Sequence, residues 1–274
     1  MFNVFRREMR ANLKAVIIWG AAMFAFSAVG FGEYAVVTGG ETPMDFDKMI
    51  NIMPRLVQLM MGMGKYEPGT SEIISVSTAQ GWYICMFLWC GLVAYIHAAL
   101  LGADILSKEE RDKTAEFLYT KPIKRSEAVC GKMAAAVLNS FFVVFVCWAG
   151  AVLTFLAQLK DVSVINAGSI TLSMFGMFLT AQVFMFLGIL LSTVLRGRGK
   201  ALTASVWAVA VFYALGVAFE AYNLPVRAVT PMMWFDSARV IYVGFEPLYA
   251  ALAVAVSVLA GFLSVKVYGA RELN

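Results

Sequence analysis

Side chains with obvious chemical reactivity are few in this chain. His97 is the sole histidine among 274 residues, and the four cysteines contain no C-x-x-C pair. A Ser-His-Asp triad would have to use His97, and the cysteine spacing indicates neither a zinc site nor a disulfide framework. A phosphate-binding loop requires the pattern G-x-x-x-x-G-K-[ST], which neither Gly131-Lys132 nor Gly199-Lys200 completes. We therefore expect no catalytic residue, no metal site and no nucleotide-binding site in this chain.

Two other features allow more than one interpretation. His97 falls in the middle of an apolar stretch, where a histidine is either a proton relay, a substrate contact or a packing residue, and packing is favoured. Methionines between residues 38 and 80 suggest Cu(I) as a ligand, since thioethers favour that ion. Several of them are needed for the apolar face of a helix, so burial is favoured over copper. These methionines are Met44, Met49, Met53, Met60, Met61 and Met63.

The composition is that of a membrane protein. Hydrophobic residues make up 61% of the chain and charged residues 15%, whereas about half of a soluble domain is apolar. Six apolar runs each supply the roughly 20 residues that a bilayer crossing needs. We expect an all-α integral membrane fold that forms one transmembrane domain over residues 1–274. The predicted spans cover about residues 14–37, 81–106, 127–156, 167–195, 201–221 and 247–268.

Three shorter segments accompany these spans. Residues 1–13 alternate apolar and basic side chains, a pattern typical of an elbow helix that lies in the membrane plane. Residues 38–80 include an amphipathic helical pattern, which we expect to rest on the outer membrane surface or on the mouth of the protein, with a kink at Pro54. Residues 222–246 are too apolar for a free loop, and we expect short outer helices that partly re-enter the membrane.

The distribution of positive charge predicts the orientation. With a cytoplasmic N-terminus, 16 of the 22 Lys and Arg residues fall on the inner side. Cytoplasmic loops carry such an excess. We therefore expect a multi-pass protein of the cell membrane with both termini in the cytoplasm. Glu220 would lie near the outer surface, where it either contacts headgroups and water or faces an exit vestibule.

A densely charged segment, residues 107–126, joins the second and third spans. It must lie in water, because each charge would cost several kcal/mol at the membrane centre. We expect Ser107 to cap a short helix whose first turn carries Glu109 and Glu110, and Pro122 to end it. An ordinary solvated loop is the alternative interpretation. The apolar side chains of this expected docking helix are Phe117 and Leu118.

The same segment resembles the signature E-x-x-x-x-T-x-E-x-L-x-x-x-P-[IV]-x-R…K of ABC-2-type permeases, the membrane subunits of ABC transporters. Residues 230–236 (T-P-M-M-W-F-D) are similar to the family's "SPF-x-x-F-D" segment, with Met in place of the usual aromatic residue. Residues 268–273 (Y-G-A-R-E-L) are similar to its terminal aromatic…R-D-L. The matching positions of the signature are Glu110 (or Glu109), Thr114, Glu116, Leu118, Pro122, Ile123, Arg125 and Lys132.

This resemblance implies that residues 107–126 contain a coupling helix, seated in a groove of a separate ABC ATPase subunit. ATP and Mg²⁺ would bind to that subunit, so this chain would be neither an enzyme nor a holder of cofactors. Its other partners would be membrane lipid and a second permease subunit, identical or related, and no nucleic acid. Spans 2 and 5 would line the pathway at the interface between the two permease subunits. The candidate lining residues are Tyr83, Phe87, His97, Thr203, Trp207 and Tyr213.

The function implied is ATP-driven export of an amphipathic or lipid-like substrate, a peptide or a drug. A first alternative is a membrane anchor or mechanotransmitter that uses the ATPase to act on an outer partner without transport. The length of residues 38–80 supports that alternative. A second alternative is a self-sufficient channel or proton-coupled carrier, with His97 and Asp104 as relays.

Overall fold

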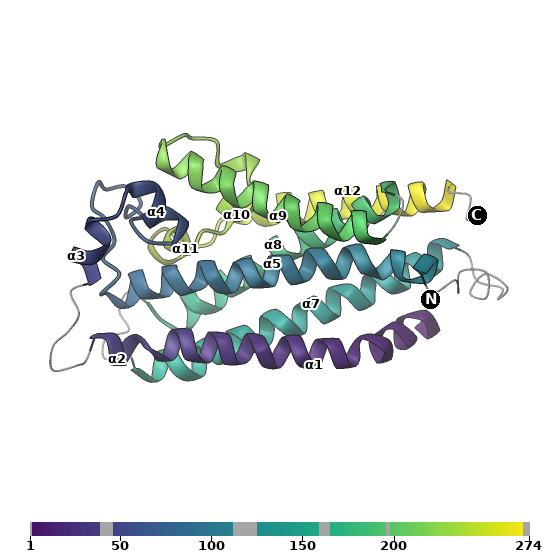
Figure 1. The fold of residues 1–274 in the computed structure, drawn as a ribbon, viewed down its shortest axis with the longest axis horizontal. Coiled ribbons are helices and arrows are strands. Elements are labelled where there is room, and N and C mark those ends of the chain that lie inside the picture. The colour runs from purple at the N-terminus through teal and green to yellow at the C-terminus, as the bar shows by residue number, and fades with distance from the viewer. Residues whose placement is uncertain (1, 39–45, 112–124, 159–164, 196–197, 271–274) are drawn as a thin grey trace.

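The computed structural model describes residues 2–38, 46–111, 125–158, 165–195 and 198–270. Its six long helices are each apolar enough to span a membrane, and the described residues form no β-sheet (Figure 1). The all-α membrane fold is therefore confirmed, with every predicted span present. The six helices are α1 (Phe2–Gly32), α5 (Ala79–Arg111), α7 (Arg125–Phe155), α8 (Ala167–Val194), α9 (Arg198–Ala221) and α12 (Pro247–Ala270).

The connecting segments separate to two ends of the bundle. The N-terminus, the end of α5, the start of α7 and the C-terminus lie together at the right of Figure 1. The shorter helices gather at the opposite end, where the predicted spans place residues 38–80 and 222–246. That this second end faces outward stays a prediction, and it is called the outer end below. It carries α2 (Tyr34–Thr38), α3 (Phe46–Asn51), α4 (Arg55–Met60), η1 (Leu156–Gln158), η2 (Arg227–Val229), α10 (Pro231–Trp234) and α11 (Ser237–Tyr242).

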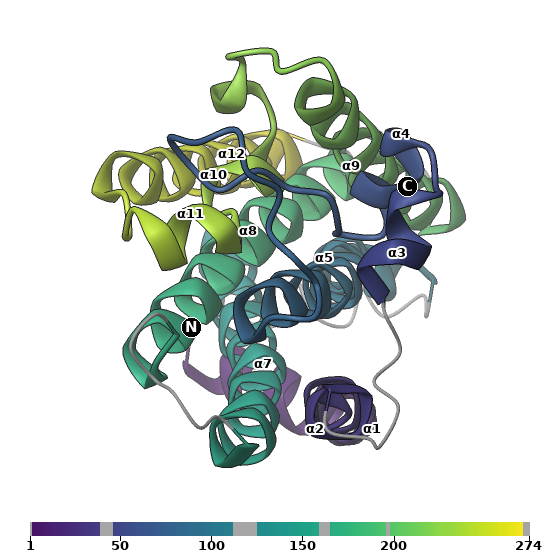
Figure 2. The same ribbon diagram turned by 90° about the vertical axis from the view of Figure 1, so that its left-hand side faces the viewer.

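Helix α8 is the centre of the bundle and packs against α5, α7, α9 and α12 (Figure 2). Its contact with α5 is made by small residues that let the backbones approach closely. A Cβ on Gly102 would lie 2.0 Å from the carbonyl oxygen of Met185, and one on Gly188 would lie 2.4 Å from that of Ala99. Helix α1 is peripheral and packs chiefly on α7. The α5–α8 pair therefore forms the rigid core of the subunit.

Two local expectations need correction. Ser107 does not begin a new helix, because α5 continues through it to Arg111. Lys, Glu and Arg are good helix formers, so nothing in residues 107–111 interrupts the span that precedes them. Pro54 does not kink one helix but separates α3 from α4, since a proline cannot supply the backbone donor that a continuous helix needs.

The N-terminal segment is joined to its span without a break, because α1 runs from Phe2 to Gly32. Its position in the membrane plane stays a prediction. The expected start of α7 at about residue 127 is confirmed to within two residues, because α7 begins at Arg125 and carries Glu127 in its first turn. The short helices expected in residues 222–246 are present as η2, α10 and α11.

Substitution of Gly102 tests the α5–α8 contact. We expect Gly102→Ala to lower the unfolding free energy by about 1–3 kcal/mol, the usual cost of overpacking, because the new methyl group meets a backbone carbonyl. Gly269→Ala is the matched control, since that helical glycine has open space around its Cβ position. Thermal unfolding in detergent micelles measures both. Equal midpoints for the two variants would refute the close approach.

Candidate functional site

Residues 46–78, called the outer segment below, include a turn that presents Lys65. The Gln58 side-chain amide donates hydrogen bonds to the carbonyls of Ile50 (3.0 Å) and Met53 (2.9 Å), which ties α4 to α3. Gly64 has a φ of +66°, a conformation that glycine adopts without steric cost. A Cβ there would also lie 2.5 Å from Gln58 Oε1. The glycine and the glutamine together fix the backbone that carries Lys65.

Two carboxylates from distant segments meet the Lys65 ammonium group. Asp236 precedes α11 and accepts a hydrogen bond from the Ala238 backbone N–H at 2.8 Å. Its second carboxylate oxygen accepts a hydrogen bond from Lys65 Nζ. Glu220, in the last turn of α9, places Oε2 at 3.9 Å from the same nitrogen. The three residues, called the outer triad below, therefore join the outer segment, α9 and α11.

The surroundings shift the pKa values of the Lys65–Asp236 pair. Burial alone would lower the pKa of Lys65, but the charges of Asp236 and Glu220 and the hydrogen bond to Asp236 raise it above its ordinary value. Burial alone would raise the pKa of Asp236. The Lys65 charge and the hydrogen bonds from Lys65 and Ala238 outweigh it and lower this pKa. Both residues are therefore charged at neutral pH.

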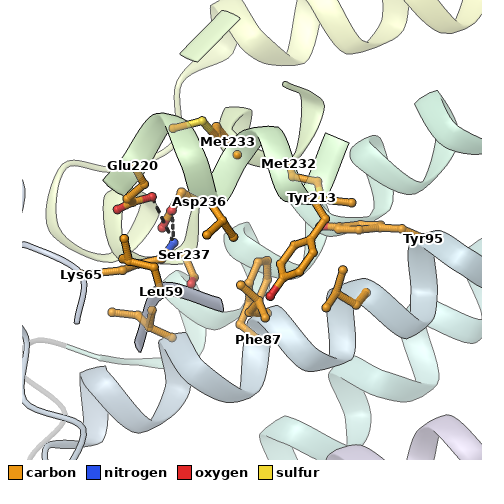
Figure 3. A pocket seen from close by; sticks show the side chains of 15 residues that line it. Leu59, Lys65, Phe87, Tyr95, Tyr213, Glu220, Met232, Met233, Asp236 and Ser237 are labelled. Atoms are coloured by element: carbon orange, nitrogen blue, oxygen red, sulfur yellow. Dashed lines mark hydrogen bonds and ion pairs between the residues drawn. The ribbon is translucent and has the colours of Figure 1, made fainter. Parts of the chain in front are cut away.

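The outer triad closes one end of a cavity of about 70 Å³ between α5, α9 and the outer segment. Figure 3 shows the charged side chains at one end and the rings of Phe87, Tyr95 and Tyr213 at the other. The Tyr213 hydroxyl donates a hydrogen bond to the Met60 carbonyl, which links α9 to the end of α4. The remaining apolar wall comprises Leu59, Ile84, Leu88, Leu92, Val217, Met232 and Met233.

A second and wider hollow, about 640 Å³, lies on the other side of the triad and is called the outer groove below. Glu220, Asp236 and Met233 line both the cavity and the groove. These three side chains therefore form the wall between the two spaces. Glu67, Arg239 and Glu246 add further charges to the groove.

Arg227 holds the groove in shape. Its guanidinium donates hydrogen bonds to the carbonyls of Met233 and Trp234, both at 2.6 Å, and forms an ion pair with Glu246. The same group lies 4.5 Å from the centre of the Tyr249 ring, a cation–π distance. Arg227 thereby fastens α10 to the start of α12.

The structure brings together two of the six predicted lining residues. Phe87 and Tyr213 both line the cavity. Tyr83 lies behind Phe87, with ring centres 6.0 Å apart, and its hydroxyl is 2.7 Å from that of Ser173 in the buried core. Their contribution to a pathway stays a prediction, as does the vestibule interpretation of Glu220, which lines both the cavity and the outer groove.

The other three predicted lining residues lie elsewhere. His97 is buried and packs on Trp19, with ring centres 4.9 Å apart, which agrees with the favoured packing interpretation. Thr203 and Trp207 are exposed on α9 and do not line the cavity. In the described part of the chain, no three His, Cys, Asp or Glu side chains gather as metal ligands would.

The predicted coupling helix falls mostly outside the described residues. Glu109 and Glu110 belong to the last turn of α5, and Arg125 begins α7. Their role in docking stays a prediction. The expected docking residues that lie outside the described part of the chain are Thr114, Glu116, Phe117, Leu118 and Pro122.

Lys65 was not expected in a site from the sequence. Its pairing joins residues 171 positions apart, and neither periodicity nor local charge indicates such a contact. One available signal was the glycine-rich context of Gly62, Gly64 and Gly69 around a lone lysine. A second was the charge of Asp236 at the end of an apolar motif.

A bundle of six apolar helices with charged segments at two ends defines a multi-pass membrane protein. Comparison with protein families matches residues 2–226 to the ABC-2 family transporter proteins. The match covers most of the chain, which therefore belongs to this family and is a transmembrane subunit of an ABC transporter. Family membership implies an ABC ATPase partner in general. No curated protein sequence matches the chain.

The ion pair between Lys65 and Asp236 can be tested by a double-mutant cycle. We expect Lys65→Met and Asp236→Asn each to lower the unfolding free energy by about 3–5 kcal/mol, because each strands a buried charge or polar group. The double variant should lose less than the sum. Arg239→Met, at a half-exposed arginine 3.9 Å from Glu246, should cost less than about 1 kcal/mol. Strictly additive losses would contradict the pairing.

The lowered pKa of Asp236 predicts a pH dependence. A carboxyl with a lower pKa in the folded state stabilises the fold above its ordinary pKa of about 4, and this contribution is lost as pH falls through the folded value. The difference in unfolding midpoint between the native chain and Asp236→Asn should therefore be full at pH 6 and shrink progressively below about pH 4. A difference that grows with acidity would show that the assigned pairing is wrong.

Proposed function

We propose that this chain is the membrane subunit of an ATP-driven transporter that exports amphipathic molecules through a pair of permease subunits. The observation that carries this proposal is the division of the cavity wall. Aromatic and aliphatic side chains of α5 and α9 form most of it, while Lys65, Glu220 and Asp236 close the outer end. An amphipathic molecule has the same division between an apolar tail and a polar head.

The small volume of the cavity supports the interpretation that the subunit is in a state closed to cargo. Small-molecule sites usually enclose about 300–1,000 Å³, whereas this cavity has about 70 Å³, enough for only a few water molecules. Admission of cargo therefore requires α9 or the outer segment to move away from α5. The outer groove, about 640 Å³, lies directly beyond the triad and supports export as the direction.

Helix α5 supplies a mechanical connection for ATP-driven movement. Its 33 residues span about 50 Å at 1.5 Å per residue. Phe87 lines the cavity near the outer end of α5. Glu109 and Glu110 lie at the opposite end of the same helix, where residues 107–126 with the proposed coupling helix begin. Displacement of that segment by an ATPase would therefore tilt a helix that reaches the cavity wall.

A mechanical role without transport is a second candidate. Three apolar side chains of the outer segment, Met49, Ile52 and Leu56, are exposed by 54%, 85% and 49%, which supports contact with an outer partner. The two roles differ in one measurable respect. Cargo should stimulate ATP hydrolysis by the reconstituted complex if the subunit transports, and should leave it unchanged if the subunit only transmits force.

The proposed coupling helix is tested by Phe117→Ala combined with Leu118→Ala. We expect a folded, membrane-inserted chain that has lost at least about 30-fold in affinity for its ATPase, since buried interface anchors each contribute about 2 kcal/mol or more. Co-purification from native membranes in mild detergent, with mass spectrometry of the captured chains, gives the readout. The native preparation should contain a subunit carrying G-x-x-x-x-G-K-[ST].

The matched control for this variant is Phe2→Ala combined with Val194→Ala, at two apolar side chains that are exposed by 72% and 60% at the same end of the bundle. The control should retain the ATPase. Undiminished ATPase capture by the Phe117/Leu118 variant would exclude the segment as the docking site.

A further inference from the structure

The Lys65 side chain places an ammonium group between two carboxylates at the mouth of an apolar cavity. Its nitrogen donates to Asp236 and lies 3.9 Å from Glu220 Oε2, and the side chain is only 12% exposed. Lys65 belongs to the outer segment, whereas Glu220 belongs to α9 and Asp236 precedes α11. The ammonium group can therefore leave the carboxylates by movement of the outer segment alone.

We propose that Glu220 and Asp236 form the subsite for a primary ammonium group on the exported amphiphile, and that Lys65 occupies this subsite when no cargo is present. The inference rests on the proposed function and specifies the chemistry of its substrate. A primary alkylammonium has the same head group as a lysine side chain. It can donate hydrogen bonds to the same two carboxylates while its tail lies along the apolar wall.

The charges around the triad select a cation over an anion. The guanidinium of Arg227 is already bonded to two carbonyls and to Glu246. Arg55 donates to the Gly64 carbonyl at 3.2 Å and lies over the Tyr66 ring. Arg239 lies 3.9 Å from Glu246. Arg227 and Arg239 are thus engaged with acceptors of the chain itself, and Arg55 is engaged through one terminal nitrogen, while its other terminal nitrogen is buried without a hydrogen-bond partner among the described residues.

The carboxylate of Glu220, unlike the arginines just described, is only loosely paired within the chain. Among the described residues, none donates a hydrogen bond to its carboxylate, and its one ion pair is with the Lys65 ammonium at 3.9 Å. Asp236, Arg55 and Arg239 interact with it electrostatically from farther away. The side chain is 27% exposed and faces both the cavity and the outer groove. Glu220 therefore retains its capacity to accept hydrogen bonds from an incoming ammonium group.

The apolar wall suits the rest of such a molecule. Phe87, Tyr95 and Tyr213 present aromatic rings to the cavity, and such rings offer a large apolar surface to an alkyl tail. The side chains of Met232 and Met233 adapt to tails of different shape. An alkylammonium in this position would have its head at the triad and its tail toward the centre of the membrane.

Exchange of the two ammonium groups would also open the route outward. Glu220, Asp236 and Met233 separate the cavity from the outer groove, and Lys65 ties the outer segment across that wall. A cargo ammonium that replaces Lys65 would release this tie while keeping both carboxylates neutralised. The opening would then be linked to the presence of cargo, because an unoccupied pair of buried carboxylates is strongly disfavoured.

The test measures binding of three probes that share an eight-carbon tail: octylammonium, octyl sulfate and octanol. The purified chain in detergent micelles is titrated by calorimetry, and its thermal unfolding is followed with each probe. We expect Lys65→Met to bind octylammonium about tenfold more tightly than the native chain does, because the competing ammonium group is gone. Lys65→Met is expected to unfold at a lower midpoint temperature than the native chain. Octylammonium should restore most of this difference, and octanol should not.

Glu220→Gln provides a variant that keeps the Lys65–Asp236 pair and is therefore expected to fold. It should weaken octylammonium binding by about tenfold, the loss expected for one charge-assisted hydrogen bond, and leave octanol binding unchanged. Glu72→Gln, at an exposed carboxylate of the outer segment, and Lys200→Met, at an exposed lysine of the opposite end, are the matched controls. Neither should alter any of the three titrations.

The proposal is overturned if Lys65→Met gains no affinity for octylammonium over the native chain, or if Glu220→Gln binds it as tightly as the native chain does. A higher affinity for octyl sulfate than for octylammonium, in the native chain or in Lys65→Met, would also overturn it. The titrations use this chain without an ATPase. Failure to capture an ATPase would therefore refute the transporter role and leave the ammonium subsite intact. Absence of octylammonium binding would refute the ammonium subsite and leave the transporter role intact.

Discussion

Hydrocarbon accepts neither an unpaired peptide group nor an unpaired charge, and the architecture of this subunit follows from that constraint. Six helices satisfy their backbones internally, and the connecting segments gather at the two ends of the bundle (Figure 1). Two buried lysines are each provided with an acceptor. Lys132, which is 1% exposed at the charged end of α7, donates to the Ile105 carbonyl of α5 at 2.9 Å. Lys65 is held in the same way at the outer end.

The rigid and the movable parts of the subunit follow from how closely the helices pack. Gly102 and Gly188 bring α5 and α8 so near that no methyl group fits between them. By contrast, the outer triad joins three segments through a few polar contacts. Displacement of α9 or of the outer segment would break those contacts and leave the α5–α8 pair unchanged. The core can therefore transmit movement to an outer end that is built to separate.

The sequence predicted the six spans well, because hydrophobic length is a local property that requires no knowledge of contacts. It failed at Ser107, where good helix formers carry α5 onward beyond the apolar run. The family resemblance placed Phe87, Tyr213 and Trp207 in the pathway. Phe87 and Tyr213 line one cavity, Trp207 is exposed on α9, and the place of all three in a pathway stays a prediction. An all-round apolar helix does not indicate which of its faces is covered. Lys65 was missed because its partners are 155 and 171 positions away.

The energetics of the outer triad explain why a charged contact occurs where an apolar one would have sufficed. A buried ion pair usually adds little net stability over apolar side chains of similar volume, yet removing one partner costs about 3–5 kcal/mol. Such a contact holds the outer end closed while both charges are present. Under the proposed exchange, an equivalent contact with another cation would replace it at little net cost, because the carboxylates are already desolvated. An apolar seal at Glu220 and Asp236 would have no such exchange partner, and its opening would not depend on the charge of the cargo.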